Sequence, residues 1–157
     1  VGNAMQPLVS YSVGAGNKKR IKRFTYIGFL TIIAFTIIMY GAIFFKTNEL
    51  VHLFVEPSKK VVQEGIPAVR IYFLSLFFAM INLYFSVFFQ ASLYPGYALI
   101  VSLLRGFFLS ILFVIIMPLI FGASGIWWVM FAAEGITMIV TIGLIHSYKK
   151  ASAIADA

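Results

Sequence analysis

Two ionisable side chains stand inside long apolar stretches of the chain, where they could hold or exchange a small cation. Glu134 occurs in the run FAAEGIT, and Arg105 occurs in the run SLLRGFF. An ionised carboxylate within a hydrocarbon layer is costly, so Glu134 must be paired, protonated or facing water. It could therefore carry a proton or a sodium ion during transport, or it could be one half of a structural pair. The sequence leaves both alternatives open.

Arg105 is the natural partner of Glu134 by depth. If Tyr97–Pro118 and Ser124–His146 form consecutive antiparallel helices, Arg105 lies roughly 12 Å and Glu134 roughly 18 Å from the same membrane surface. The remaining gap of roughly 6 Å is within reach of an arginine side chain that bends toward the carboxylate. The sequence thus predicts an intramembrane ion pair between the last two helices. The alternative is that the Arg105 side chain extends to the cytoplasmic headgroups.

Neutral polar residues in the preceding apolar stretch form a second candidate set. Ser75, Asn82 and Ser86 are spaced so that they share one face of a helix. Such a stripe could line a cavity for an organic cation, or it could hydrogen-bond to a neighbouring helix. Candidates for the lining of a substrate cavity are Asn82, Gln90, Ser75, Ser86 and Tyr84, the tyrosine through cation–π contact.

No catalytic residue and no metal site is predicted. The chain contains no cysteine, which excludes disulfides and thiolate metal ligands. His52 and His146 lie at opposite ends of their apolar stretches, and no Ser/His/Asp set or carboxylate pair suggests an enzyme. The run GAGNKK at residues 14–19 lacks the spacing of a phosphate-binding loop. A glycine that closes a helix beside cations is the ordinary interpretation.

The elements that must position these residues are four apolar stretches: Phe24–Phe45, Pro67–Gln90, Tyr97–Pro118 and Ser124–His146. Each is about 22 residues long, and a helix of that length rises roughly 33 Å, enough to cross the hydrocarbon core of a bilayer. The chain is 62% hydrophobic and 11% charged, whereas soluble domains are about 25% charged. The predicted fold class is all-α: a polytopic membrane helix bundle with four full transmembrane helices plus the end of a fifth.

The domain organisation follows from these stretches. We expect residues 1–13 to be the end of a truncated transmembrane helix, because thirteen residues rise only about 20 Å. The start at Val1 favours a piece of a larger bundle over a separate short product. The remaining segments are a basic cytoplasmic loop at 14–23, a four-span bundle at 24–148 and a cytoplasmic tail at 149–157.

Residues 46–66 form the only long connection within this bundle. Apolar residues at helical spacing on both sides of Pro57 predict two short amphipathic helices at the outer interface, the second ending at Gly65. The connections at 92–96 and 121–125 contain glycine and are tight, so they predict antiparallel neighbours.

The basic residues orient the bundle. Three lysines fall on the face of the long connection, beside three glutamates. Seven fall on the opposite face, with both chain ends: Lys18, Lys19, Arg20, Lys22, Arg23, Lys149 and Lys150. This excess is the positive-inside pattern, so both chain ends are expected in the cytoplasm. The net charge of +7 therefore has a membrane explanation, and no nucleic-acid partner is predicted.

Four motifs in order resemble the C-terminal half of a multidrug and toxic compound extrusion (MATE) transporter. The first three are QPLVSYSVGAGNKKR at residues 6–20, LFVEPSKKVVQEGIPAVRIY at 53–72 and FFQASLYPG at 88–96. The fourth combines Ser102, Arg105 and Pro118 with Gly122, Gly125, Ile126 and Trp127. The family usually has a glycine soon after the alanine of the third motif, whereas here Gly96 comes later.

This resemblance implies two six-helix lobes, with substrate bound between them, and this chain as most of the C-terminal lobe. It implies antiport in the cell (inner) membrane, with H⁺ or Na⁺ moving inward and organic, often cationic, compounds moving outward. The implied partners are the N-terminal lobe of the same transporter, membrane lipids and organic cations. Two alternatives stay open: a lipid-linked oligosaccharide or polysaccharide flippase of the same superfamily, and a small membrane scaffold that does not transport.

Overall fold

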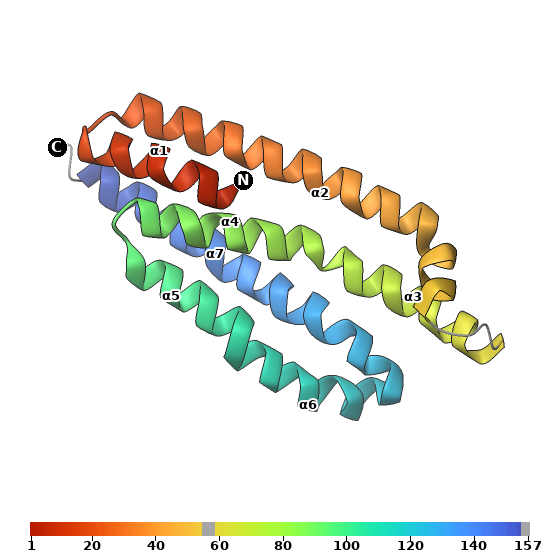
Figure 1. Ribbon diagram of the computed structural model, residues 1–157. Coiled ribbons are helices and arrows are strands. Elements are labelled where there is room, and N and C mark those ends of the chain that lie inside the picture. The colour runs from red at the N-terminus through yellow and green to blue at the C-terminus, as the bar shows by residue number, and fades with distance from the viewer. Residues whose placement is uncertain (55–58, 155–157) are drawn as a thin grey trace.

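The computed structural model describes the backbone of residues 1–54 and 59–154 and the side chains of residues 1–51 and 65–152. All regular secondary structure within these ranges is helical, so the predicted all-α fold class is confirmed. Figure 1 shows the helices lying side by side along one long direction, with the end of α7 near the α1–α2 connection.

The helices follow the apolar stretches, with two irregular segments between them. In chain order the elements are α1 (Gly2–Gly14), α2 (Lys18–Phe54), α3 (Lys59–Leu74), α4 (Leu76–Ala91), α5 (Pro95–Leu103), η1 (Leu104–Phe108), α6 (Leu109–Phe121), η2 (Gly122–Trp128) and α7 (Val129–Ile154). The segment η1 is a π-helix and η2 is a 3₁₀-helix.

Three helical stretches are long and apolar enough to cross a membrane: Lys18–Val51, Gly65–Ala91 and Pro95–Ser152. The third is 58 residues long and includes α5, α6 and α7. Figure 1 shows that the chain turns back at η2, so that α6 and α7 lie antiparallel and in contact. Membrane-spanning helices are thus present, and the count of four spans stays a prediction.

The connection between α1 and α2 is closed by a glycine, as the sequence indicates. Gly16 has a φ of +63°, and the amides of Gly16 and Asn17 donate to the carbonyls of Val13 and Ser12 at 3.0 and 2.9 Å. These are the two hydrogen bonds of a Schellman motif. The Asn17 side chain then caps α2 by accepting from the amide of Arg20 at 3.0 Å.

Helix α4 is the centre of the bundle. It contacts α1, α2, α5 and α7, and its aromatic residues supply much of the buried core. That core consists of Met5, Val9, Ile32, Tyr84, Phe88, Phe89, Ala91, Ala98 and Val101. Since the core joins four helices at the end of the bundle that holds the α1–α2 connection, it aligns the helices that carry the candidate site.

The segment 46–66 differs from its prediction. Helix α2 continues without a break to Phe54, and α3 runs through Gly65 and Pro67 to Leu74. The predicted separate first helix and the predicted end of the second helix at Gly65 are therefore wrong, and the position of segment 46–66 at the outer interface stays a prediction. Pro57, the expected point of separation, lies outside the described residues.

Side chains just after the apolar stretch form contacts within the continued helix. Lys46 Nζ donates to Glu49 Oε1 at 2.5 Å, an i,i+3 pair on the helix surface. The Thr47 hydroxyl donates to the carbonyl of Ile43 at 2.7 Å. No proline or glycine interrupts the sequence between these residues and Pro57. The polar residues at 46–49 therefore end the apolar stretch but do not end the helix.

The connection between α6 and α7 is also helical. Helix α6 continues past Pro118 to Phe121, and Gly122, with a φ of +66°, ends it. Gly125 then packs directly on the preceding helix, where an added Cβ would overlap the carbonyl group of Met117. This close approach makes η2 a compact corner that brings α7 back along α6.

Candidate functional site

The carboxylate of Glu134 lies inside the bundle and accepts hydrogen bonds from Arg105 and Asn82. Glu134 is 1% exposed. Arg105 Nε donates to its Oε1 at 3.0 Å, and Arg105 Nη2 forms an ion pair with the same oxygen at 2.8 Å, while Asn82 Nδ2 donates to Oε2 at 2.9 Å. A carboxylate bonded only to donors is in the arrangement that suits its ionised form. The structure thus brings together the two charged residues that the sequence pairs.

Arg105 reaches Glu134 from the π-helical segment η1. A π-helix admits an extra residue per turn, and such segments are rare and frequently occur at functional sites. The Ser110 hydroxyl donates to the main-chain carbonyl of Arg105, which stabilises the widened turn. The Arg105 guanidinium points to the Glu134 carboxylate. The side chain therefore does not extend toward the lipid headgroups, which was the alternative prediction.

Asn82 connects the ion pair to α4. Its Nδ2 donates to the main-chain carbonyl of Glu134 as well as to the carboxylate, both at 2.9 Å. Its Oδ1 accepts from the Thr141 hydroxyl at 3.0 Å. Asn82 and Thr141 are completely buried. One continuous hydrogen-bond network therefore joins α4, η1 and α7.

Sequence reasoning missed two members of this network. Thr137 donates to the carbonyl of Ala133 at 2.8 Å, and Thr141 can also donate to the carbonyl of Thr137 at 2.9 Å. Both threonines are completely buried on the helix face of Glu134. Their spacing from Glu134, three and seven residues, is the signal that could have found them.

The other members of the polar stripe bond within the bundle. Ser86 contacts α5, with its hydroxyl 3.4 Å from the Ala98 carbonyl and 3.3 Å from the Ser102 hydroxyl. Ser75 occupies the interruption between α3 and α4, where its hydroxyl donates to the Tyr72 carbonyl at 2.6 Å. Ser75 and Ser86 are both buried. At Asn82 and Ser86 the polar side chains therefore form hydrogen bonds to neighbouring helices, which is the second of the two alternatives for this stripe.

Tyr84 and Gln90 are not brought together with Glu134. Tyr84 is completely buried between α1 and α2, where its hydroxyl donates to the Thr25 carbonyl at 2.5 Å and lies 2.8 Å from Met5 Sδ. Gln90 is exposed in the last turn of α4. In this structure the Tyr84 side chain is therefore packed against α1 and α2.

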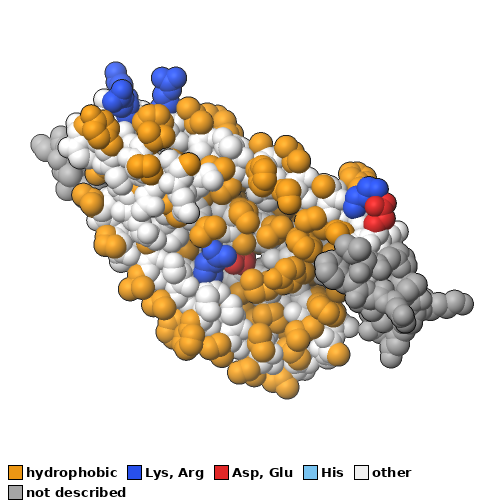
Figure 2. All heavy atoms as spheres, in the orientation of Figure 1, with side chains coloured by type: hydrophobic (Ala, Val, Ile, Leu, Met, Phe, Trp, Pro, Cys, Tyr) orange, Lys and Arg blue, Asp and Glu red, His pale blue; other side chains and the backbone are white. Residues whose placement is uncertain are grey.

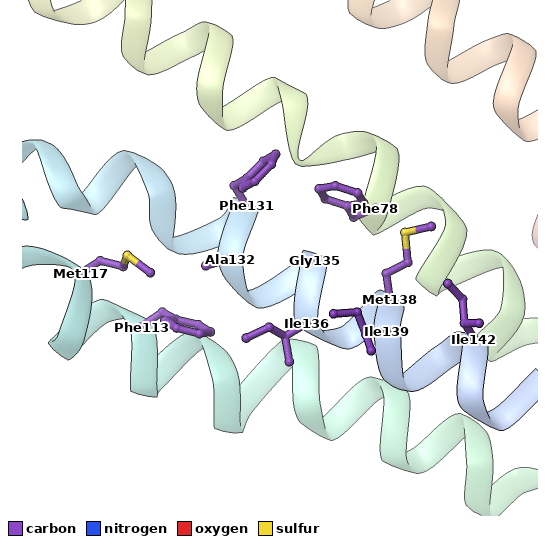
Figure 3. A pocket seen from close by; sticks show the side chains of 10 residues that line it. All are labelled: Phe78, Phe113, Met117, Phe131, Ala132, Gly135, Ile136, Met138, Ile139 and Ile142. Atoms are coloured by element: carbon purple, nitrogen blue, oxygen red, sulfur yellow. The ribbon is translucent and has the colours of Figure 1, made fainter.

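The opposite face of α7 borders an open apolar groove of about 540 Å³. Figure 3 shows Phe78 of α4 and Phe113 and Met117 of α6 around it, with Gly135 and Ile139 on α7. Its other lining residues are also apolar. The groove holds none of the predicted site residues and offers no charged group, so it suits hydrocarbon chains rather than a coupling cation.

The ion pair interrupts a hydrophobic surface. Ion pairs join Lys46 to Glu49 at the end of α2 and Arg105 to Glu134 within the bundle. Figure 2 shows two places where basic and acidic side chains touch, one beside the grey residues and one in the middle of the hydrophobic face. A charged pair so placed in a membrane-spanning bundle is typical of a functional or tightly paired site.

Comparison with known proteins identifies the family. The MatE family model matches residues 1–116, which include α1 to α5, η1 and most of α6. The match thus includes Asn82 and Arg105 and ends before Glu134. No curated protein and no solved structure gave a significant match. Because the match spans most of the chain and agrees with the four motifs, the chain belongs to the MatE family of membrane transporters.

Proposed function

We propose that this chain is the C-terminal lobe of a cation-coupled antiporter that exports organic, often cationic, compounds. The coupling cation is H⁺ or Na⁺, and Glu134 is its carrier in this lobe. The observation that supports the proposal is the burial of Glu134, held by Arg105 and Asn82, within the membrane-spanning helices of a MatE-family chain. Intramembrane carboxylates commonly belong to proton or ion pathways.

The partners follow from the two-lobe arrangement. Substrate and ion sites of many transporters lie between repeated halves, so this lobe would need an N-terminal lobe to transport. Membrane lipids would surround the apolar outer surfaces. Both chain ends would lie in the cytoplasm, in agreement with the positive-inside excess.

The arginines favour the antiporter over the lipid-linked sugar flippase. A flippase for a diphosphate-linked lipid would need free basic groups in one cavity. Arg105 is engaged by Glu134, and the Arg70 guanidinium lies over the Phe44 ring, 4.4 Å from its centroid. Within the described part of the chain, these two arginines therefore do not form a common anion site.

The test is efflux from proteoliposomes that contain the intact transporter with this lobe. A proton gradient and a sodium gradient are applied separately, and the efflux of a fluorescent organic cation is recorded. We expect Glu134→Gln to abolish gradient-driven efflux while the variant stays folded. The matched control is Glu49→Gln, which changes an exposed glutamate at the end of α2 and should leave efflux unchanged.

Two results would contradict the proposal. Efflux retained in Glu134→Gln would make Glu134 a structural residue and move the coupling site elsewhere. Failure of the wild type to export any organic cation under either gradient would favour the flippase, and transport of a lipid-linked oligosaccharide would then be measured.

A further inference from the structure

The two partners of Glu134 differ in how firmly the structure holds them. Asn82 is completely buried and uses both ends of its amide, bonding the Glu134 carboxylate, the Glu134 main chain and Thr141. The Arg105 side chain is 24% exposed, whereas that of Glu134 is 1% exposed. Asn82 is thus fixed between α4 and α7, while Arg105 lies within reach of the surface.

The backbone that carries Arg105 is also the irregular one. It lies in η1, between the regular helices α5 and α6. The next residue is Gly106, around which an added Cβ would meet nothing within 4 Å. A glycine with open space in a π-helical turn leaves room for that turn to rearrange. The hydrogen bonds between Asn82 and α7 do not involve η1, so a displacement of Arg105 need not break them.

Withdrawal of Arg105 would leave the carboxylate without a counter-charge. Among the described residues, Arg105 is the cation that pairs with Glu134, and the other side chain that donates to the carboxylate, Asn82, is neutral. Removing one member of a buried ion pair is strongly unfavourable because the other charge stays buried and uncompensated. A second small cation would restore the balance.

We infer that Arg105 is a tethered counter-cation that competes with free H⁺ or Na⁺ for Glu134. The inference deepens the proposed function, on which it rests for its role in transport. In the state seen here Arg105 occupies the carboxylate, and binding of a free cation requires Arg105 to leave. Asn82 keeps the carboxylate in place in both states, so the exchange moves η1 relative to α7.

The experiment measures cation binding without transport. The intact protein in lipid nanodiscs is titrated with Na⁺ at constant ionic strength, and its apparent melting temperature is recorded. A second series lowers the pH without Na⁺ and follows the infrared band of a protonated carboxyl group. We expect Arg105→Gln to lower the concentration of Na⁺ or H⁺ at half-saturation by at least about tenfold relative to the wild type.

Control variants locate the effect. Arg105→Gln combined with Glu134→Gln should lose this binding, and Lys46→Gln, which breaks the exposed pair with Glu49, should leave the wild-type midpoint unchanged. Equal or weaker cation binding in Arg105→Gln overturns the inference. Binding that survives in the double variant overturns it as well, because the cation would then occupy another group.

Arg105→Lys keeps the inference testable if Arg105→Gln does not fold. Lysine retains the charge but cannot donate two hydrogen bonds from a planar fork, so its midpoint should lie below that of the wild type. A midpoint equal to or above the wild-type value contradicts the competition. If these variants bind the cation more tightly but the wild type shows no gradient-driven efflux, only the proposed function is overturned. If the wild type shows efflux but the variants have unchanged midpoints, only the inference is overturned.

Discussion

At the scale of single residues, the buried carboxylate of Glu134 is tolerated because a cation and a buried amide donate to it. Arg105 neutralises the charge, and Asn82 supplies the remaining side-chain donor. Charge-assisted hydrogen bonds are roughly twice as strong as neutral ones. The desolvation of two charges offsets much of that gain, so the pair specifies how the helices meet more than it adds to stability.

A second single-residue requirement lies at Gly28, where α2 approaches the Tyr84 hydroxyl. A Cβ at this position would lie 2.7 Å from Met5 Sδ and 2.9 Å from the Tyr84 hydroxyl oxygen. We predict that Gly28→Ala destabilises the protein by about 1–3 kcal/mol, because the overpacked site must displace the Tyr84 ring. The measurement is the apparent melting temperature in nanodiscs.

The matched control for Gly28→Ala is Gly41→Ala in the same helix. An added Cβ at Gly41 would meet nothing within 4 Å. Alanine is the better helix former by about 0.5–1 kcal/mol, so this variant should be as stable as the wild type or slightly more stable. Equal effects of the two substitutions would refute the packing explanation.

At the scale of elements, the end of α4 carries a strained residue. Leu93 has a φ of +65°, and the Tyr94 amide donates to the Phe89 carbonyl at 2.9 Å across the turn. This is the position of the left-handed residue of a Schellman motif, which glycine adopts most readily. MATE sequences usually have a glycine soon after the alanine here, and in this chain Leu93 is the residue that adopts the left-handed conformation.

We predict that Leu93→Gly stabilises the protein by roughly 1 kcal/mol, because a side chain in the left-handed region costs about 1–2 kcal/mol. Leu93 is 77% exposed, so little packing is lost. Thermal unfolding in nanodiscs provides the comparison. Leu93→Ala removes the same exposed side chain but keeps the strain, and a gain as large as that of Leu93→Gly would argue against the backbone explanation.

Helix α7 shows how one element separates two environments. Glu134, Thr137 and Thr141 lie on the face that meets α4 and η1, while Gly135 and Ile139 line the apolar groove. Since residues three, four and seven apart share a helix face, this division follows from the helical period. The polar network is thereby kept on one side of the helix and the groove on the other.

At the scale of the whole molecule, the bundle has two chemically distinct ends. The basic start of α2 lies near the end of α7 (Figure 1), and Lys46–Glu49 lies toward the far end of α2. The charge asymmetry predicts that the end with the basic start faces the cytoplasm. This orientation can be tested directly, because the chain contains no cysteine that would react with a label.

We predict that a membrane-impermeant thiol reagent labels Glu49→Cys in intact cells and labels Lys150→Cys only after the membrane is permeabilised. Both positions are exposed, so access depends on the side of the membrane rather than on burial. The protein without either substitution is the control. Labelling of Lys150→Cys in intact cells would reverse the orientation, and labelling of both would place them on one side.

The amino-acid sequence by itself determined the helical class and the membrane environment, and it predicted the pairing of Arg105 with Glu134 beside the alternative that Arg105 extends to the headgroups. Each follows from properties that act along the chain: the length of an apolar stretch, the rise of a helix and the cost of a charge in hydrocarbon. The closure of α1 by glycine belongs to the same group, since it depends on a few neighbouring residues. The four motifs added the family, which the match over residues 1–116 confirmed.

Only the tertiary structure decided which polar residues belong to the site. Asn82 and Glu134 are 52 residues apart, and their contact depends on how α4 and α7 are rotated about their axes. That rotation is set by packing over many side chains rather than by a local pattern. For the same reason, Tyr84 turned toward α1 and α2, and Thr141 joined the network. The rise of a helix predicts how deep a residue lies in the membrane. The rotation of the helix about its axis decides which residues its side chain contacts.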